Sequence, residues 1–175
     1  MVCLLIKNER IASVFSRFLI IGGPLVEAKI EQFRQVFKAS HSDYAQKEVG
    51  TCSFAYGEVA DELADLVAKK IKTGTSSLHQ LYAIEKEKVP AVGDVFIVLD
   101  GKENPICVIE NTAVEVLPFR EVTEQHAFLE GEGDRSLAYW RQVHIEFFSE
   151  EVKNYSDATF TDDSLIVYET FRVID

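Results

Sequence analysis

The sequence predicts an α+β domain whose strands form an antiparallel sheet or a small barrel. Amphipathic helical patterns occupy the first part of the chain, segments rich in β-branched residues follow, and a further helical pattern precedes the last apolar segment. This order, with helices grouped before hairpin-linked strands, is typical of α+β folds. A length of 175 residues suits a single domain with its own hydrophobic core.

Two amphipathic helices are predicted in the first part of the chain. Over residues 27–38 apolar side chains recur at helical spacing, and the positions that share this face are Val26, Ile30, Phe33 and Phe37. A second helix is predicted from about residue 58 to residue 70. Its inner face carries Val59, Leu63, Leu66 and Val67, and its outer face carries Glu58, Asp61, Glu62 and Asp65. We interpret both as packing helices.

The periodicity changes after residue 72. Residues 94–99 and 106–117 are predicted strands, joined by Asp100-Gly101-Lys102-Glu103-Asn104-Pro105, which has the composition of a hairpin connection. A third helix over residues 136–150, with Asp134 as its N-cap, precedes a last strand over 165–174. Hairpin-linked strands of this length favour antiparallel pairing over a doubly wound sheet.

Residues 1–25 are predicted to be an N-terminal extension that is packed on the domain or poorly ordered, and residues 26–175 form the domain. Charged residues interrupt the extension, and its longest uncharged run, 18–26, is shorter than the ~20 residues of a membrane span. Charges follow the apolar start, the reverse of a secretory signal. Cys3, Cys52 and Cys107 form no CxxC pair. A cytoplasmic protein without membrane contact is expected.

The formal net charge of -11 is unevenly distributed. Residues 121–175 hold thirteen acidic and four basic residues, whereas residues 1–72 hold nine acidic and ten basic ones. An acidic surface repels a phosphate backbone, so binding of long duplex nucleic acid is excluded. A small ligand or a locally basic groove is compatible with this charge. The oligomeric state is not predicted.

An acidic segment follows the predicted strands, in which Glu130, Glu132 and Asp134 are separated only by glycines. Because glycine permits many backbone conformations, we predict that this segment is a loop. Alternating carboxylates can begin a calcium loop, but Arg135 stands at the position of the turn glycine and Arg141 at that of the closing glutamate. No metal or other cofactor is therefore expected. We expect Glu130 to face a cleft, Asp134 to cap the helix, and Glu132 to be solvated or bonded to the loop.

Several short segments occur in a characteristic order, and they are Phe54-Ala55-Tyr56-Gly57, Lys72-Thr73-Gly74-Thr75-Ser76-Ser77-Leu78, Val92-Gly93-Asp94 and residues 130–140. Over residues 50–174 the chain resembles the ASCH domain family, which is related to the PUA domain. The resemblance implies an α+β fold with a small PUA-like antiparallel β-barrel and flanking helices.

The hallmark of that family is a GxKxxTxR pattern, which corresponds here to Lys70, Lys72, Thr75 and Ser77. The lysine and the threonine match. Lys70 replaces the glycine, and Ser77 replaces an arginine whose guanidinium could bind a phosphate or carboxylate with two parallel hydrogen bonds. This departure puts such bidentate recognition in doubt.

The resemblance implies a cleft that binds a small nucleoside-like ligand or an unpaired RNA base. Relatives of the fold bind RNA, and one branch of small ASCH proteins removes the acetyl group from acetylated cytidine with a Lys, a Thr and a Glu. Lys72, Thr75 and Glu130 stand at the matching positions and are the candidate catalytic residues. The further candidate ligand-binding residues are Ser77, Glu110, Glu132, Arg135 and Tyr56.

The implied chemistry requires Thr75 as the nucleophile and Lys72, with a lowered pKa, as the base that takes the Thr75 proton. Glu130 would bind the exocyclic amine of the nucleobase or pass a proton to the leaving amine. Because Lys72 and Thr75 are three residues apart, a turn must lead into the strand. Glu110 interrupts an apolar strand and needs a partner, for which Lys72 and Arg120 are candidates.

Three functions remain open from the sequence. The chain is a module that binds a nucleoside or an unpaired base, an amide hydrolase acting on a modified nucleoside, or an interaction protein with a vestigial cleft. His144 is interpreted as a core histidine, and Trp140 as a core anchor that could also stack on a base.

Overall fold

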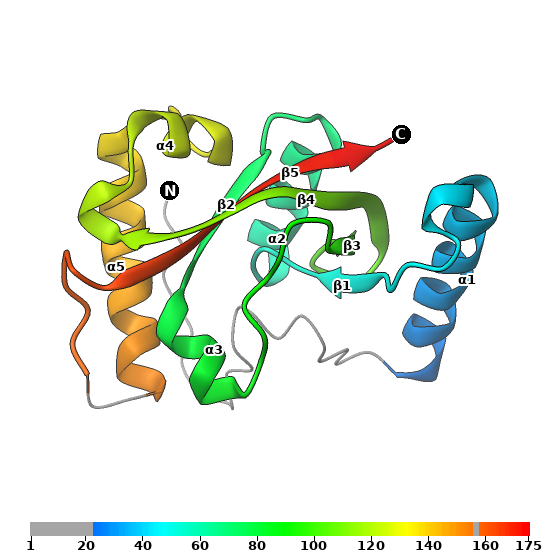
Figure 1. The fold of residues 1–175 in the computed structure, drawn as a ribbon, viewed down its shortest axis with the longest axis horizontal. Coiled ribbons are helices and arrows are strands. Elements are labelled where there is room, and N and C mark those ends of the chain that lie inside the picture. Colours follow the sequence, from blue (N-terminus) through cyan, green and yellow to red (C-terminus); the bar gives the residue numbers. More distant parts are fainter. Residues whose placement is uncertain (1–22, 156–157) are drawn as a thin grey trace.

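A computed structural model describes residues 23–155 and 158–175 of the chain, so nearly all of the expected N-terminal extension lies outside the described residues. The helices are α1 (Pro24–Ser40), α2 (Gly57–Ala68), α3 (His79–Glu85), α4 (Glu124–Glu130) and α5 (Leu137–Tyr155). The strands are β1 (Gly50–Cys52), β2 (Gly74–Leu78), β3 (Val95–Leu99), β4 (Pro105–Pro118) and β5 (Leu165–Ile174). Figure 1 shows α1 at one end of the molecule and α4 and α5 at the other.

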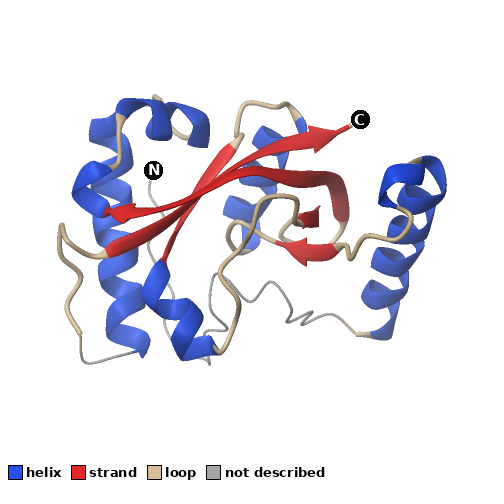
Figure 2. Ribbon diagram, in the orientation of Figure 1, coloured by secondary structure: helices blue, strands red, loops and turns tan. Residues whose placement is uncertain are grey.

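The five strands form one sheet in the order β1-β3-β4-β5-β2. Strand β1 runs parallel to β3, and the other neighbouring pairs are antiparallel (Figure 2). The prediction of an α+β fold is confirmed. The sheet is not closed in the described residues, so the predicted barrel is not confirmed, and the parallel pair departs from the predicted antiparallel order.

Helices cover both faces of the sheet. One cluster places Leu78 of β2 and Ile166 of β5 against Trp140 and Phe148 of α5. A second packs Ile97 of β3 against α1, and a third packs β-strand residues including Phe171 of β5 against Ala64 and Val67 of α2. Since side chains alternate along a strand, α2 covers the face of β5 opposite to that covered by α5.

Most predicted elements are present with shifted ends. The hairpin of β3 and β4, the helices α1, α2 and α5, and strand β5 were predicted, whereas β1, α3 and α4 were not. Asp134 was wrongly predicted as the cap of α5. The Ser136 hydroxyl accepts a hydrogen bond from the Tyr139 amide at 3.1 Å, and Asp134 accepts from the Ser136 amide at 2.8 Å. Within the described residues, every helix is too short or too polar to cross a membrane.

Candidate functional site

Lys72 lies in the turn between α2 and β2. Its amide and that of Ile71 both donate to the Leu66 carbonyl, and the Thr73 amide donates to Leu129 of α4 at 2.7 Å. Lys70 adopts a left-handed conformation with φ of 58°, at the position where the family pattern has glycine. The turn that the spacing of Lys72 and Thr75 requires is therefore present.

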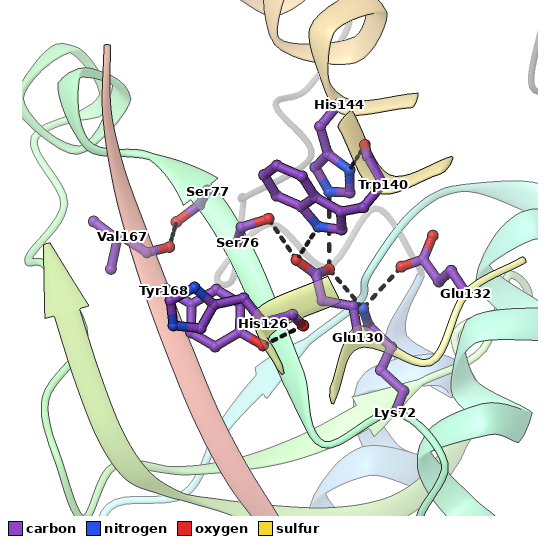
Figure 3. Close-up of polar contacts among 10 residues, drawn as sticks. All are labelled: Lys72, Ser76, Ser77, His126, Glu130, Glu132, Trp140, His144, Val167 and Tyr168. Atoms are coloured by element: carbon purple, nitrogen blue, oxygen red, sulfur yellow. Dashed lines mark hydrogen bonds and ion pairs between the residues drawn. The ribbon is translucent and has the colours of Figure 1, made fainter. Parts of the chain in front are cut away.

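The Lys72 ammonium group is buried between two carboxylates. Its Nζ donates to Glu130 Oε2 at 3.1 Å and to Glu132 Oε1 at 2.8 Å (Figure 3). Lys72 and Glu130 are each 1% exposed, whereas the Glu132 side chain is 23% exposed. Nζ also lies 5.4 Å from the centre of the Phe54 ring. Glu132 is thus the solvent-facing member of the pair of carboxylates.

Glu130 is the last residue of α4, and both of its carboxylate oxygens contact other side chains. Its Oε1 accepts hydrogen bonds from Ser76 Oγ at 2.7 Å and from Trp140 Nε1 at 2.6 Å. Its Oε2 lies 3.8 Å from Nε2 of His144, whose Nδ1 is 2.9 Å from the Trp140 carbonyl oxygen. We call these residues the Lys72 network, and its members are Lys72, Glu130, Glu132, Ser76, Trp140 and His144 (Figure 3).

The carboxylates keep Lys72 charged. Burial alone would lower the pKa of Lys72, but the charges of Glu132 and Glu130 and their hydrogen bonds outweigh it, so the pKa is raised. Burial would raise the pKa of Glu130, but Lys72, His144 and the bonds from Ser76 and Trp140 lower it. The predicted lowered pKa of Lys72 is therefore wrong, and an ammonium ion cannot serve as a base.

Thr75 points away from the Lys72 network. It is followed in β2 by Ser76, which contacts Glu130, and consecutive side chains of a strand lie on opposite faces. Thr75 is 7% exposed, and its hydroxyl makes no hydrogen bond with any described residue. The structure thus brings Lys72 and Glu130 together and places Thr75 on the other face of β2.

Two of the other candidate ligand residues, Ser77 and Arg135, have local contacts, and a third, Tyr56, is exposed. Ser77 is fully buried, and its hydroxyl is bonded to the Tyr82 hydroxyl at 2.8 Å. The Arg135 guanidinium donates two hydrogen bonds to the Phe128 carbonyl oxygen and stacks on the Phe128 ring. Tyr56 precedes α2 and is 41% exposed, so it remains accessible to a ligand.

Glu110 does not pair with Lys72 or Arg120, so that expectation is wrong. Its carboxylate accepts from Lys47 Nζ at 2.8 Å, from Arg172 at 2.7 Å and from the Tyr44 hydroxyl at 2.9 Å. Lys47 and the other donors outweigh burial and lower the pKa of Glu110 to about 2. These contacts tie β4 to β5 and to the segment after α1.

Sequence reasoning missed several members of the site. No role was predicted for Ser76, although the alternation of side chains along a strand places Ser76 and Thr75 on opposite faces of β2. The Trp140 indole was predicted to be a core anchor, and it is one: His144 and Phe119 stack on it, with ring centres 4.1 and 5.2 Å away. Trp140 is also 3% exposed, so its ring is not accessible to a base in this structure. Glu169, which is 1% exposed, also went unnoticed.

Known proteins of the same fold were found. A family model described as the ASCH domain matches residues 50–175. The chain is similar to the ASCH domain from Lactobacillus crispatus JV V101, with 31% identity, a TM-score of 0.74, and coverage of 89% of this chain and 98% of that one. It is also similar to a protein from Enterococcus faecalis V583, with 34% identity, a TM-score of 0.75, and coverage of 85% and 90%. None of the curated proteins matches. The chain therefore belongs to the ASCH domain family.

Proposed function

We propose that this protein binds a nucleoside, or an unpaired base of RNA, beside the Lys72 network. The observation that carries the proposal is an ion pair in which Lys72 and Glu130 are both 1% exposed. Removing two charges from water costs several kcal/mol for each ion, on the order of what good pairing returns. Ionisable groups held at such a cost are often found at functional sites.

The partly exposed Glu132 supports a ligand with an exocyclic amine. Lys72 and Glu130 are each 1% exposed, so a ligand does not reach them directly, whereas the Glu132 side chain is 23% exposed. One oxygen of Glu132 accepts from Lys72, and the carboxylate can accept further hydrogen bonds from the exocyclic amine of a base. Phe54, whose ring centre lies 5.4 Å from Lys72 Nζ, supplies aromatic surface for stacking, and Tyr56, two residues further along the chain, is 41% exposed.

A titration with free nucleosides tests this proposal. Amide resonances are followed by NMR while cytidine, uridine, adenosine, guanosine and a short single-stranded RNA are added at low salt. We expect shifts near residues 72, 130 and 132, and at least a tenfold loss of affinity in Lys72→Gln. Lys69→Gln is the matched control, because Lys69 is exposed and paired only with Asp65 one helical turn away. Equal binding of the two variants, or tight binding of duplex RNA, would contradict the proposal.

Hydrolysis of an acylated nucleoside is the second candidate. It is favoured by the Thr75 hydroxyl, which makes no hydrogen bond with any described residue and stands in register with the buried Glu169 of β5. Incubation with acylated nucleosides, alongside Thr75→Ala, Lys72→Ala and Glu130→Ala, tests this activity. Turnover that is lost in all three variants supports it, whereas stoichiometric binding without turnover supports the binding module alone.

A further inference from the structure

The face of the sheet that α2 covers carries polar side chains that the Lys72 network does not use. Thr75 of β2 and Glu169 of β5 are register partners, so both side chains leave the sheet on this face. Directly opposed residues of antiparallel strands have Cβ atoms about 4.5–5.5 Å apart. The two side chains are therefore neighbours, and the Thr75 hydroxyl has no hydrogen-bond partner among the described residues.

Glu169 is oriented by a neighbour on β4. Asn111 Nδ2 donates to Glu169 Oε2 at 2.5 Å, and the two residues are 2% and 1% exposed. A buried carboxylate needs hydrogen-bond donors, and a donor on one oxygen fixes the direction of the other. Nucleophile, base and orienting group occur in this order in enzymes that form acyl intermediates.

The groups of the Lys72 network are not placed to take the proton of Thr75. Lys72 keeps its own protons, because two carboxylates raise its pKa. Ser76 and Glu130 meet on the opposite face. Strand β2 is at the edge of the described sheet, so Glu169 is the cross-strand neighbour of Thr75 there.

We propose that Glu169 is the general base that activates Thr75 for acyl transfer, with Asn111 as its positioning residue. The Thr75 hydroxyl bonds to the acyl carbon as its proton moves to Glu169. The carbon–nitrogen bond then breaks, and its electron pair stays on the nitrogen, which takes the proton from Glu169 and leaves as the amine. Water attacks the resulting Thr75 ester, and its proton passes through Glu169 to the Thr75 oxygen as the carboxylic acid departs.

This inference rests on the second candidate function, hydrolysis of an acyl group, but its test requires no natural substrate. The purified chain is incubated with p-nitrophenyl acetate. Release of nitrophenolate is followed together with the mass of the peptide that contains Thr75. We expect the wild type to gain one acetyl group on Thr75, and Thr75→Val to gain none there. Glu169→Gln should slow this acylation by about 10²–10⁴-fold.

The control is Glu115→Gln, because Glu115 is largely exposed and in register with Tyr168 on the other face. It should acylate at the wild-type rate. Asn111→Ala leaves the carboxylate in place but removes the hydrogen bond from Asn111, and should slow acylation at least tenfold. This variant keeps the proposal falsifiable if Glu169→Gln does not fold. The rate in Glu169→Gln should also lose its carboxylate-dependent pH profile and rise only with hydroxide.

A wild type that is not acylated on Thr75 overturns the proposal. So does a folded Glu169→Gln variant that reacts at the wild-type rate with an unchanged pH profile. Nucleoside binding is measured separately by the NMR titration, where Glu169→Gln should shift the resonances near residue 72 as the wild type does. The two experiments therefore test separately whether Glu169 acts as the general base and whether a nucleoside binds beside the Lys72 network.

Discussion

Gly131 lies directly against the backbone of Ile71. A Cβ atom on Gly131 would stand 2.8 Å from the Ile71 carbonyl oxygen and 3.0 Å from the Lys72 nitrogen. Gly131 also has φ of 75°, a conformation that side chains rarely adopt. The end of α4 and the turn that carries Lys72 therefore approach as closely as a glycine allows.

Gly131→Ala should consequently separate Glu130 from Lys72 and destabilise the fold by about 2 kcal/mol or more. Urea unfolding measures this loss, and nucleoside titration should show weakened binding. Gly57→Ala is the control, because Gly57 also has positive φ but nothing lies within 4 Å of its added Cβ. A Gly131→Ala variant as stable as Gly57→Ala would show that the close approach is not maintained in solution.

Lys70→Gly should stabilise the protein. Lys70 has φ of 58°, which costs a non-glycine residue about 1–2 kcal/mol. Its exposed ion pair with Asp175 contributes less, about 0–1 kcal/mol. We expect a higher melting temperature for this variant and a lower one for Lys69→Gly, since Lys69 has ordinary helical φ of -80°. A melting temperature lowered by both changes would contradict this account.

Lys72 and Glu130 should be strongly coupled in stability. Lys72→Met leaves a buried carboxylate without its cation, and such a loss typically costs about 3–5 kcal/mol. In Lys72→Met with Glu130→Leu neither charge remains, so the double variant should be more stable than the sum of the single changes predicts. A double-mutant cycle in urea measures the coupling. Additive effects would mean that the two groups do not interact.

Glu151 of α5 should make stability depend on pH. It is buried, neither of its oxygens has a hydrogen-bond partner among the described residues, and burial together with Glu85 raises its pKa to about 8. The pKa of Glu151 is higher in the folded state than its ordinary value of 4.5 in the unfolded state. The free energy of unfolding is therefore highest below pH 4.5 and falls as the pH rises to about 8.

The wild type should therefore lose up to about 5 kcal/mol between these pH values through Glu151. Glu151→Gln should lack this component and be the more stable protein at pH 8.5. Thermal unfolding across the pH range measures it, with the exposed neighbour Glu150→Gln as control. A parallel pH dependence of Glu151→Gln and the wild type would refute the assignment.

Local patterns predicted the long elements and missed the short ones. Helix α2 and strand β5 were found because their apolar periodicity extends over ten or more residues. Helices α3 and α4 have seven residues each, too few for a periodic signal. Glu130 was predicted to be in a flexible loop, but it ends α4, and Gly131 is the left-handed residue after it.

The contact of Lys72 with Glu130 was expected only through the family resemblance, because 58 residues separate them. The sequence did not predict that two carboxylates, Glu130 and Glu132, would both contact Lys72. With one carboxylate and burial a lowered pKa was a reasonable expectation, and the second carboxylate of Glu132 reverses its direction. Glu169 and Asn111 were missed because their proximity depends on the strand register.

The place of β5 in the sheet sets the order in which the site can form during synthesis. β5 comes last in sequence among the described strands, yet it lies between β4 and β2. Until it emerges, β2 has no neighbouring strand, and Thr75 lacks the residue that opposes it. Pairings between such distant segments form slowly, so loss of residues 166–175 should leave β2 without its neighbouring strand and Thr75 without Glu169, while β1, β3 and β4 can still pair.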